Sequence, residues 1–346
     1  MTSDDVNRYL RNEGGEGAAS GPDKVTPEAA GADTSGAAAD RELGRAIMRN
    51  ISYHFAGNGR AVFLTVTALV AGGHLLFEDV PGVGKTTLAK ALTGSVSGTF
   101  KRISLTPDVL PSDLTGFSVY NRKTEEFEFK KGALDCNFLL ADEINRTSPK
   151  TQSSLLEAMQ EERVSVDGVT YELPKPFMVI ATQNPVELMG TYPLPEAQLD
   201  RFLMKLSLGY PDRTNELAVI TAGAADKLTA KVQPVATCDD IVRMKNESAK
   251  VFISDQLADY VLRLVEATRR DGSISLGLSP RAGISLARAA KAMAFLYGRQ
   301  YVLPDDVKAL FVPVCAHRLM LSREAKLSGA TPENKLAQLL KTVPVE

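Results

Sequence analysis

The chain has 346 residues, 44% of them hydrophobic, which is enough to bury the core of one or two domains. Its formal net charge of −2 leaves no electrostatic footprint for nucleic acid or for an anionic membrane surface. The three cysteines, Cys136, Cys238 and Cys315, are far apart in sequence. A disulfide framework or a cysteine-ligated zinc site is therefore not expected, and a reducing cytoplasm fits better. The three histidines lack the spacing of metal ligands.

Residues 1–40 form an acidic tail rich in alanine and glycine. Between residues 14 and 40 the only large aliphatic side chain is Val25, and no aromatic residue occurs. Such a segment cannot offset the entropy cost of ordering, so we expect disorder up to about Arg41. The polar, acidic start of the chain has no character of a secretory signal, and none is expected.

The first ordered element is expected to be an amphipathic helix that ends at Gly57. It is predicted by apolar side chains that recur every fourth residue: Leu43, Ile47, Ile51 and Phe55. The apolar run 61–77 is divided by two glycines and is marginally short for a bilayer crossing. We interpret this run as a buried helix, a break and a buried strand, and we expect no membrane span.

Beyond this break, predicted helices alternate with short apolar strands, a pattern typical of a mostly parallel sheet buried on both faces. The strands are HLLF at 74–77, RISL at 102–105, NFLLA at 137–141 and FMVIAT at 177–182. One hairpin and one further strand-like stretch stand outside the alternation. The hairpin spans 163–173 around the turn Asp167-Gly168. The stretch 117–132 shows a similar strand-like alternation at Phe127 and Phe129.

From about Tyr210 onwards we expect no further strands and a separate helical domain. One helix follows Ser254, whose hydroxyl is a suitable N-cap, and carries an apolar face. Another helix begins with Ser279 as its cap and Pro280 at its first position, and Gly298 ends it. The C-terminal part of the chain is therefore predicted to be helical.

The stretch FEDVPGVGKTTLAKAL, residues 77–92, matches the phosphate-binding pattern G-x-x-x-x-G-K-[ST] except that Asp79 replaces the first glycine. We expect Asp79 to adopt the positive φ of that glycine, which aspartate tolerates better than most residues. Lys85 would reach the β- and γ-phosphates, and the Thr86 hydroxyl would bind Mg²⁺. The predicted nucleotide contacts are Pro81, Gly82, Val83, Gly84, Lys85, Thr86 and Thr87.

Two acidic residues, Asp142 and Glu143, follow directly after the strand NFLLA. In open α/β sheets, ligands collect at the carboxyl ends of the strands. A DE pair alone is common, but its place after a phosphate-binding loop makes it more specific. We predict that Asp142 holds Mg²⁺, directly or through water, and that Glu143 is the general base for the attacking water.

Three further polar residues complete the candidate site. Asn184 follows the strand FMVIAT and could orient the attacking water or contact the γ-phosphate, although Asn-Pro also forms turns. Arg201, in EAQLDRF, could act as an arginine finger on the γ-phosphate of a neighbouring subunit. Arg281 lies in the first turn of a predicted helix, where it could report the nucleotide state to a movable lid. Taken singly, each arginine is more often a structural residue.

The segments PGVGKT, LLADEINR, VIATQNP, LPEAQLDRF and LSPRA occur in an order that resembles the MoxR family of AAA+ ATPases. The resemblance covers about residues 41–320 and extends to TPDVLPSDLTG, GRQYVLPDDV and AHRL. It implies a three-layer αβα P-loop AAA+ domain over 41–209, with a mostly parallel sheet, and a small all-α lid domain over 210–346. The family also has an insert in helix 2, expected near 114–131, and a hairpin before the sensor-1 strand.

The resemblance further assigns a role to each candidate residue. Lys85 and Thr86 match Walker A, Asp142 and Glu143 match Walker B, Asn184 matches sensor 1, Arg201 the arginine finger and Arg281 sensor 2. It implies an ATPase that uses ATP and Mg²⁺ in a hexameric ring. It also implies a chaperone-like remodeller or maturation factor that acts on a client, often with a partner carrying a von Willebrand factor A-type domain. Two segments depart from the usual sequences of the family. FAGNGRAV at 55–62 replaces a Val-Gly-Gln motif and affects the expected adenine contacts, and KKGALDCN at 130–137 lacks a Gly-Pro and affects the insert that faces the substrate.

Other functional classes fit the sequence less well. A GTPase would need N-K-x-D, which is missing, and a small-molecule kinase would not need Asn184, Arg201 and Arg281 in ring-ATPase order. A nucleic-acid-dependent AAA+ motor would be expected to carry a basic stripe interleaved with aromatic residues, and this sequence shows none. A magnesium-chelatase-like motor subunit that drives metal insertion has nearly the same motifs and stays open as the alternative. Intact Lys85 and Glu143 argue against a non-enzymatic scaffold.

Overall fold

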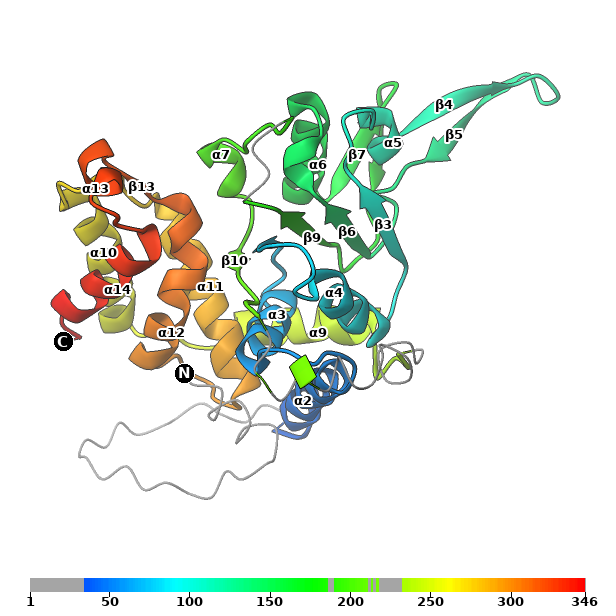
Figure 1. Cartoon of the computed structure of the whole chain (residues 1–346). Coiled ribbons are helices and arrows are strands. Elements are labelled where there is room, and N and C mark those ends of the chain that lie inside the picture. Colours follow the sequence, from blue (N-terminus) through cyan, green and yellow to red (C-terminus); the bar gives the residue numbers. More distant parts are fainter. Residues whose placement is uncertain (1–33, 186–189, 211–212, 214–215, 218–231, 346) are drawn as a thin grey trace.

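The computed structural model describes residues 34–345, apart from 186–189, 211–212, 214–215 and 218–231 (Figure 1). The expected tail therefore lies outside the described residues as far as residue 33. Helix α2 (Thr34–His54) begins ahead of Arg41, so residues 34–40 are helical and the expected start of order was placed too late. Asp40 explains the difference, because its buried carboxylate lies 2.7 Å from Nη2 of Arg243 in α9 (Cys238–Ala249). A polar contact of this kind leaves no apolar pattern in the sequence.

A five-stranded parallel sheet forms the centre of the N-terminal domain, as the apolar strands predicted. In spatial order the strands are β10 (Met204–Leu206), β1 (Leu75–Glu78), β9 (Met178–Gln183), β6 (Phe138–Asp142) and β3 (Phe100–Ser104). The short edge strand β10 was not anticipated, because its three residues include Lys205 and give no continuous apolar run.

Successive side chains of the central strands point to opposite faces of the sheet, and each face is covered by helices. Leu75 and Phe77 of β1 pack with α3 (Gly59–Val70) and α4 (Lys85–Gly94). Leu76, between them, faces the second core, to which α6 (Pro149–Glu161) contributes. The predicted three-layer αβα arrangement is thereby confirmed, as is the helix, break and strand expected over 61–77.

The C-terminal part is a mainly helical lid. Its helices are α10 (Asp255–Arg270), α11 (Pro280–Leu296), α12 (Pro304–Cys315), the 3-10 turn η2 (Ala316–Arg318), α13 (Arg323–Leu327) and α14 (Pro332–Thr342). Ser254 and Ser279 cap α10 and α11 as predicted, each hydroxyl accepting from the amide three residues later. The expectation that strands end near Tyr210 was wrong. Three short strands follow: β11 (Ala236–Thr237), β12 (Ile274–Leu276) and β13 (Met320–Leu321).

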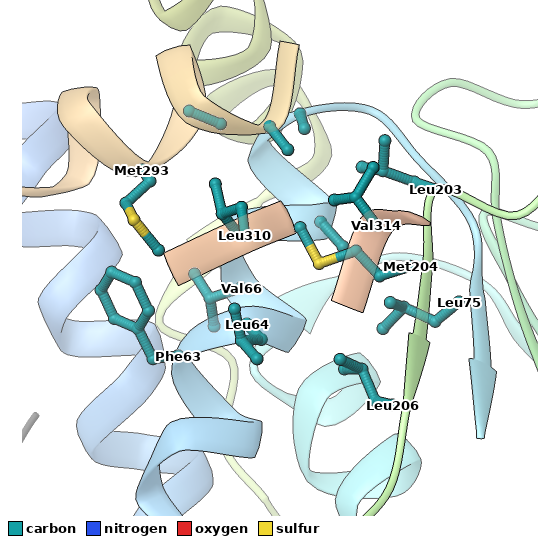
Figure 2. Packing of buried hydrophobic residues seen from close by; sticks show 14 of the residues in the cluster. Phe63, Leu64, Val66, Leu75, Leu203, Met204, Leu206, Met293, Leu310 and Val314 are labelled. Atoms are coloured by element: carbon teal, nitrogen blue, oxygen red, sulfur yellow. The ribbon is translucent and has the colours of Figure 1, made fainter. Parts of the chain in front are cut away.

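These late strands are too short for an alternating pattern to reveal them. β11 pairs in parallel with β2 (Val96–Ser97) of the first domain, whereas β12 and β13 pair with each other inside the lid. The lid also shares one hydrophobic core with the first domain. Figure 2 shows a part of this core, where α3, β1, β10 and the lid helices meet: Phe63, Leu64, Val66, Leu75, Met204, Leu206, Met293, Leu310 and Val314.

The predicted hairpin is present, and the strand-like stretch 117–132 proves to be a second hairpin. β7 (Arg163–Val166) and β8 (Val169–Glu172) are joined by Asp167 and Gly168, whose φ values of 51° and 79° are those of the expected two-residue turn. β4 (Gly116–Asn121) and β5 (Glu126–Lys131) form a longer hairpin that projects from the sheet on the side away from the lid (Figure 1). The rings of Phe129 and Tyr171 stack at 4.0 Å and connect the two hairpins.

The remaining elements are short: α5 (Pro111–Thr115), the 3-10 turn η1 (Ile144–Arg146) and α7 (Glu196–Leu199). No helix in the described residues combines the length and the hydropathy that a bilayer crossing requires.

His74 ties the sheet to α6 and is buried. Its Nδ1 accepts from the amide of Val179 at 3.0 Å, so the ring is neutral and Nε2–H donates to the carbonyl oxygen of Met159 at 2.9 Å. Burial lowers the pKa of His74 from its usual 6.5 to about 4. His74 is thus a structural residue whose uncharged ring connects β9 to α6 through two hydrogen bonds.

We predict that acid weakens the fold through this residue. Because the pKa is depressed in the folded state, the stabilisation is present above pH 6.5 and is lost as the pH falls towards 4, by about 2 kcal/mol at pH 5. Urea unfolding at pH 7.5 and pH 5.0 measures the loss. In His74→Gln, whose amide can make both hydrogen bonds without titrating, the difference between the two pH values should shrink by that amount. An equal difference in both proteins would contradict the assignment.

Candidate active site

The phosphate-binding loop has the geometry that anion binding requires. It leaves β1 after Glu78 and enters α4 at Lys85, with Gly82 and Gly84 at φ values of 87° and 94°. A Cβ atom on Gly84 would lie 3.0 Å from the ring of Phe55 and would be strained at this φ. The first amides of an α-helix such as α4 lack intrahelical partners, and helix N-termini of this kind bind phosphate.

Asp79 does not act as the expected substitute for glycine, because its φ is not positive. Its buried carboxylate instead accepts from the Ser207 hydroxyl at 2.7 Å and from the Leu208 amide at 2.6 Å, just after β10. It therefore fastens the start of the loop to the neighbouring strand. The loop keeps its shape without the first glycine because another residue type anchors it.

Lys85 reaches back across the loop. Its Nζ donates to the carbonyl oxygen of Asp79 at 2.5 Å and lies 3.4 Å from that of Gln183 at the end of β9. Burial lowers the pKa of Lys85, while the carboxylates of Asp79, Asp142 and Glu143 act in the opposite direction. A phosphate oxygen can replace these carbonyl contacts with a stronger, charge-assisted bond. Thr86 and Thr87 follow in the first turn of α4.

The acidic pair ends β6, which is separated from β1 only by β9. Asp142 is buried; its Oδ1 accepts from the Thr182 hydroxyl at 3.3 Å and its Oδ2 lies 2.6 Å from Nε of Arg102. Glu143 adopts a left-handed conformation with a φ of 58°, an uncommon state for a non-glycine residue. Its amide donates to the Thr182 hydroxyl at 2.9 Å, and its carboxylate pairs with Arg146 at 2.9 Å. The Asp142 carboxylate is thus buried and held in place, whereas the Glu143 carboxylate is reached by solvent.

Thr182, Arg102 and Arg146 were not identified from the sequence. Thr182 is the last residue of VIAT, and only the register of β6 beside β9 brings its hydroxyl to the acidic pair. Asn184, the residue after β9, is buried at the same edge of the sheet. The structure therefore brings the loop, Lys85, the acidic pair and Asn184 to the carboxyl ends of three adjacent strands.

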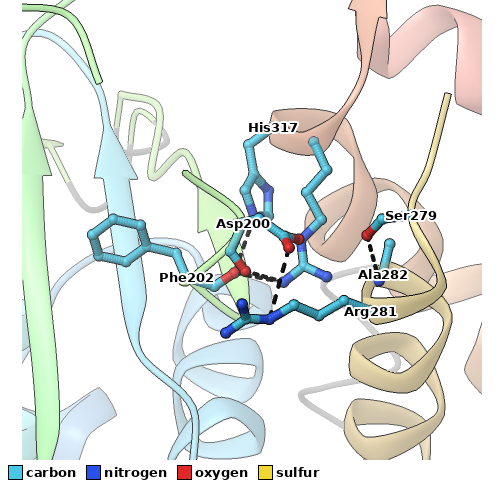
Figure 3. Close-up of polar contacts among 7 residues, drawn as sticks. Asp200, Phe202, Ser279, Arg281, Ala282 and His317 are labelled. Atoms are coloured by element: carbon cyan, nitrogen blue, oxygen red, sulfur yellow. Dashed lines mark hydrogen bonds and ion pairs between the residues drawn. The ribbon is translucent and has the colours of Figure 1, made fainter. Parts of the chain in front are cut away.

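Arg201 and Arg281 lie elsewhere. The amide of Leu203 donates to the carbonyl oxygen of His74 at 2.9 Å, which puts residues 200–203 at the amino ends of β1 and β10. Four residues of β1, about 13 Å of strand, separate that edge from the phosphate-binding loop. Nε of Arg281 lies 3.7 Å from Oδ2 of Asp200 at the same edge (Figure 3). Within one chain, neither arginine is brought to Lys85.

The available oxygen donors fit Mg²⁺ only together with phosphate. Asp142 offers a carboxylate and Thr86 a hydroxyl, both hard ligands. Among the described residues, no group of three or more His, Cys, Asp and Glu side chains could hold a metal ion. Mg²⁺ is usually held by one or two carboxylates, several waters and the substrate's phosphates, which agrees with this donor set.

Comparisons with known proteins agree with this geometry. Residues 74–204 match the family described as "ATPase family associated with various cellular activities (AAA)", and residues 266–339 match the AAA lid domain. The chain is similar to YeaC of Bacillus subtilis, with 48% identity over 88% of this chain and 94% of that protein. It is 41% identical to "Chaperone MoxR1" of Mycobacterium tuberculosis, over 83% of this chain and 78% of that protein.

A solved structure of a candidate ATPase from Cytophaga hutchinsonii superimposes with a TM-score of 0.83 at 40% identity. The match covers 90% of this chain and 97% of that one. The family, the nucleotide-binding domain and the helical lid expected from the sequence are confirmed by these relatives. The chain belongs to the MoxR family of AAA+ ATPases, and it is a nucleotide-binding enzyme that hydrolyses ATP.

Proposed function

We propose that ATP is bound and hydrolysed between neighbouring copies of this chain in a ring, most simply a hexamer. One copy supplies the loop, Lys85 and the acidic pair, and the next supplies Arg201 and Arg281. The observation that supports this is the position of both arginines at the amino edge of the sheet, opposite the phosphate-binding loop. A contact between these arginines and a phosphate then requires a second copy, in a head-to-tail arrangement that closes into a ring.

In this site, Lys85 and the amides of residues 82–87 hold the phosphates, and Asn184 and Glu143 face the attacking water. Glu143 would accept its proton, after leaving Arg146. Asp142 and Thr86 would hold Mg²⁺, which neutralises charge on the phosphates when bound. The guanidinium groups from the next copy would stabilise the charge that develops on the transferred phosphoryl group.

We further propose that hydrolysis moves the lid and the two hairpins against a client protein, as a chaperone-like remodeller in the cytoplasm. A partner with a von Willebrand factor A-type domain would direct this activity. Support comes from the relative named "Chaperone MoxR1" and from the exposed aromatic side chains of β4 and β5, namely Phe117, Tyr120 and Phe127. The magnesium-chelatase-like and nucleic-acid-dependent alternatives are not favoured, because the more extensive matches are to MoxR proteins.

We predict opposite nucleotide behaviour for two substitutions. Lys85→Ala removes the cation at the phosphates and should abolish nucleotide binding. Glu143→Gln removes the base but keeps the fold of the loop, so it should bind ATP and retain it without hydrolysis. Equilibrium binding of a fluorescent ATP analogue and phosphate release measure the two effects. Wild-type turnover in Glu143→Gln would exclude the assigned base.

We predict that Arg201→Ala binds ATP normally and loses turnover by on the order of 10³-fold. An equal mixture with Lys85→Ala should regain activity, because a Lys85→Ala copy still presents Arg201 to its neighbour. Random assembly places such a pair at about one quarter of the interfaces. The mixture's phosphate release, compared with that of each variant alone, tests the shared site. A mixture no more active than its components would contradict the proposal, as would an undiminished Arg201→Ala protein.

A further inference from the structure

The segment AHRL, residues 316–319, holds the residues around Arg201. Arg318 of η2 is almost fully buried, with 3% of its side chain exposed. Its Nη2 donates to the carbonyl oxygen of Phe202 at 2.7 Å and to that of Asp200 at 3.3 Å. These two carbonyl groups belong to the residues on either side of Arg201, so one guanidinium of the lid holds the backbone of the arginine-finger segment.

The side chains add a second layer of contacts. Nε of Arg318 lies 3.3 Å from Oδ1 of Asp200, whose Oδ2 faces Arg281 at 3.7 Å. His317 brings its Nε2 to 3.1 Å from the carbonyl oxygen of Phe202 (Figure 3). The single carboxylate of Asp200 thus lies between two lid arginines, one from η2 and one from the start of α11. The segment 200–202 is therefore in contact with both η2 and the start of α11.

Arg201 itself is half-buried. Its side chain has no hydrogen-bond or ion-pair partner among the described residues, although the residues before and after it are held through their backbone. A catalytic group gains most when its position is fixed before the reaction, and a displacement of about 1 Å costs on the order of 100-fold in rate. The amide of Arg201 donates to the carbonyl oxygen of Gln198 at 3.2 Å within its own domain, and the lid adds the contacts of Arg318 on both sides of it.

We propose that Arg318 is a positioning residue for Arg201, so that the position of the lid in one copy sets the hydrolysis rate at the ATP held by its neighbour. This inference rests on the shared site proposed above. It gives a physical route for communication around a ring, because a lid that follows its own nucleotide would move the arginine that serves the next one.

The test uses Arg318→Lys and Arg318→Met in the full-length chain. Lysine keeps the charge but cannot reach two carbonyl groups and a carboxylate together, and methionine removes all three contacts. Both should bind ATP with unchanged affinity while turnover falls by on the order of tenfold to a hundredfold. A matched control is Arg299→Lys, because Arg299 also bonds a backbone carbonyl, that of Tyr301, and a carboxylate, that of Asp306, but within the lid. The control should keep wild-type turnover.

Mixing separates positioning from simple damage to the fold. Added Lys85→Ala copies should restore turnover to Arg318→Met, since they supply a correctly placed Arg201 to its intact nucleotide site. Wild-type turnover in both Arg318 variants would overturn the inference. The inference would also be overturned if Lys85→Ala copies restored turnover to Arg201→Ala but not to Arg318→Met. Failure to rescue Arg201→Ala itself would instead reject the shared site, so the two proposals fail in different ways.

Discussion

The polarity of the parallel sheet is the constraint on which the rest of the structure depends. All five strands run in one direction, so their carboxyl ends form one edge and their amino ends the other. The phosphate-binding loop, the acidic pair and Asn184 follow strand ends and gather at the first edge. Arg201 precedes β10 and is confined to the second. No side-chain movement carries an arginine across the length of the strands, so Arg201 and the phosphate-binding loop lie at opposite edges of the sheet.

Polar anchors then fix each edge to its neighbours. Asp79 fastens the phosphate-binding loop to the residues after β10, and Arg318 fastens the residues before β10 to the lid. The same short strand is therefore held at both ends, once by the nucleotide site and once by the lid. The hydrophobic core continues from α3 into α11 and α12, so apolar side chains of the lid pack directly against the first domain. In our proposal, a change at the nucleotide reaches Arg201 through β10.

Much of this arrangement could be predicted from the sequence, because apolar runs and caps are local signals. The strands before Asp142 and Asn184 were found from their continuous hydrophobic residues, and Ser254 and Ser279 located two helix starts. The misses share a physical cause. The role of Asp79 depends on its hydrogen bond to Ser207, which is distant in sequence, and not on the φ value of the glycine that it replaces. Strands of two or three residues, such as β12 and β13, carry no periodicity to detect.

The placement of Arg201 and Arg281 relative to Lys85 could not be predicted either. It depends on the register of β10 beside β1 and on how the lid packs, and both are set by contacts between distant segments. Motif order identified these arginines as candidates, but only the fold distinguishes action within a chain from action on a neighbour.

The most direct measurement is a structure of the assembled Glu143→Gln protein with ATP bound. Our account predicts a triphosphate held by Lys85 of one copy, with the guanidinium group of Arg201 from the adjacent copy within hydrogen-bonding distance of its γ-phosphate. A bound triphosphate whose γ-phosphate is contacted by no residue of a second copy would contradict it.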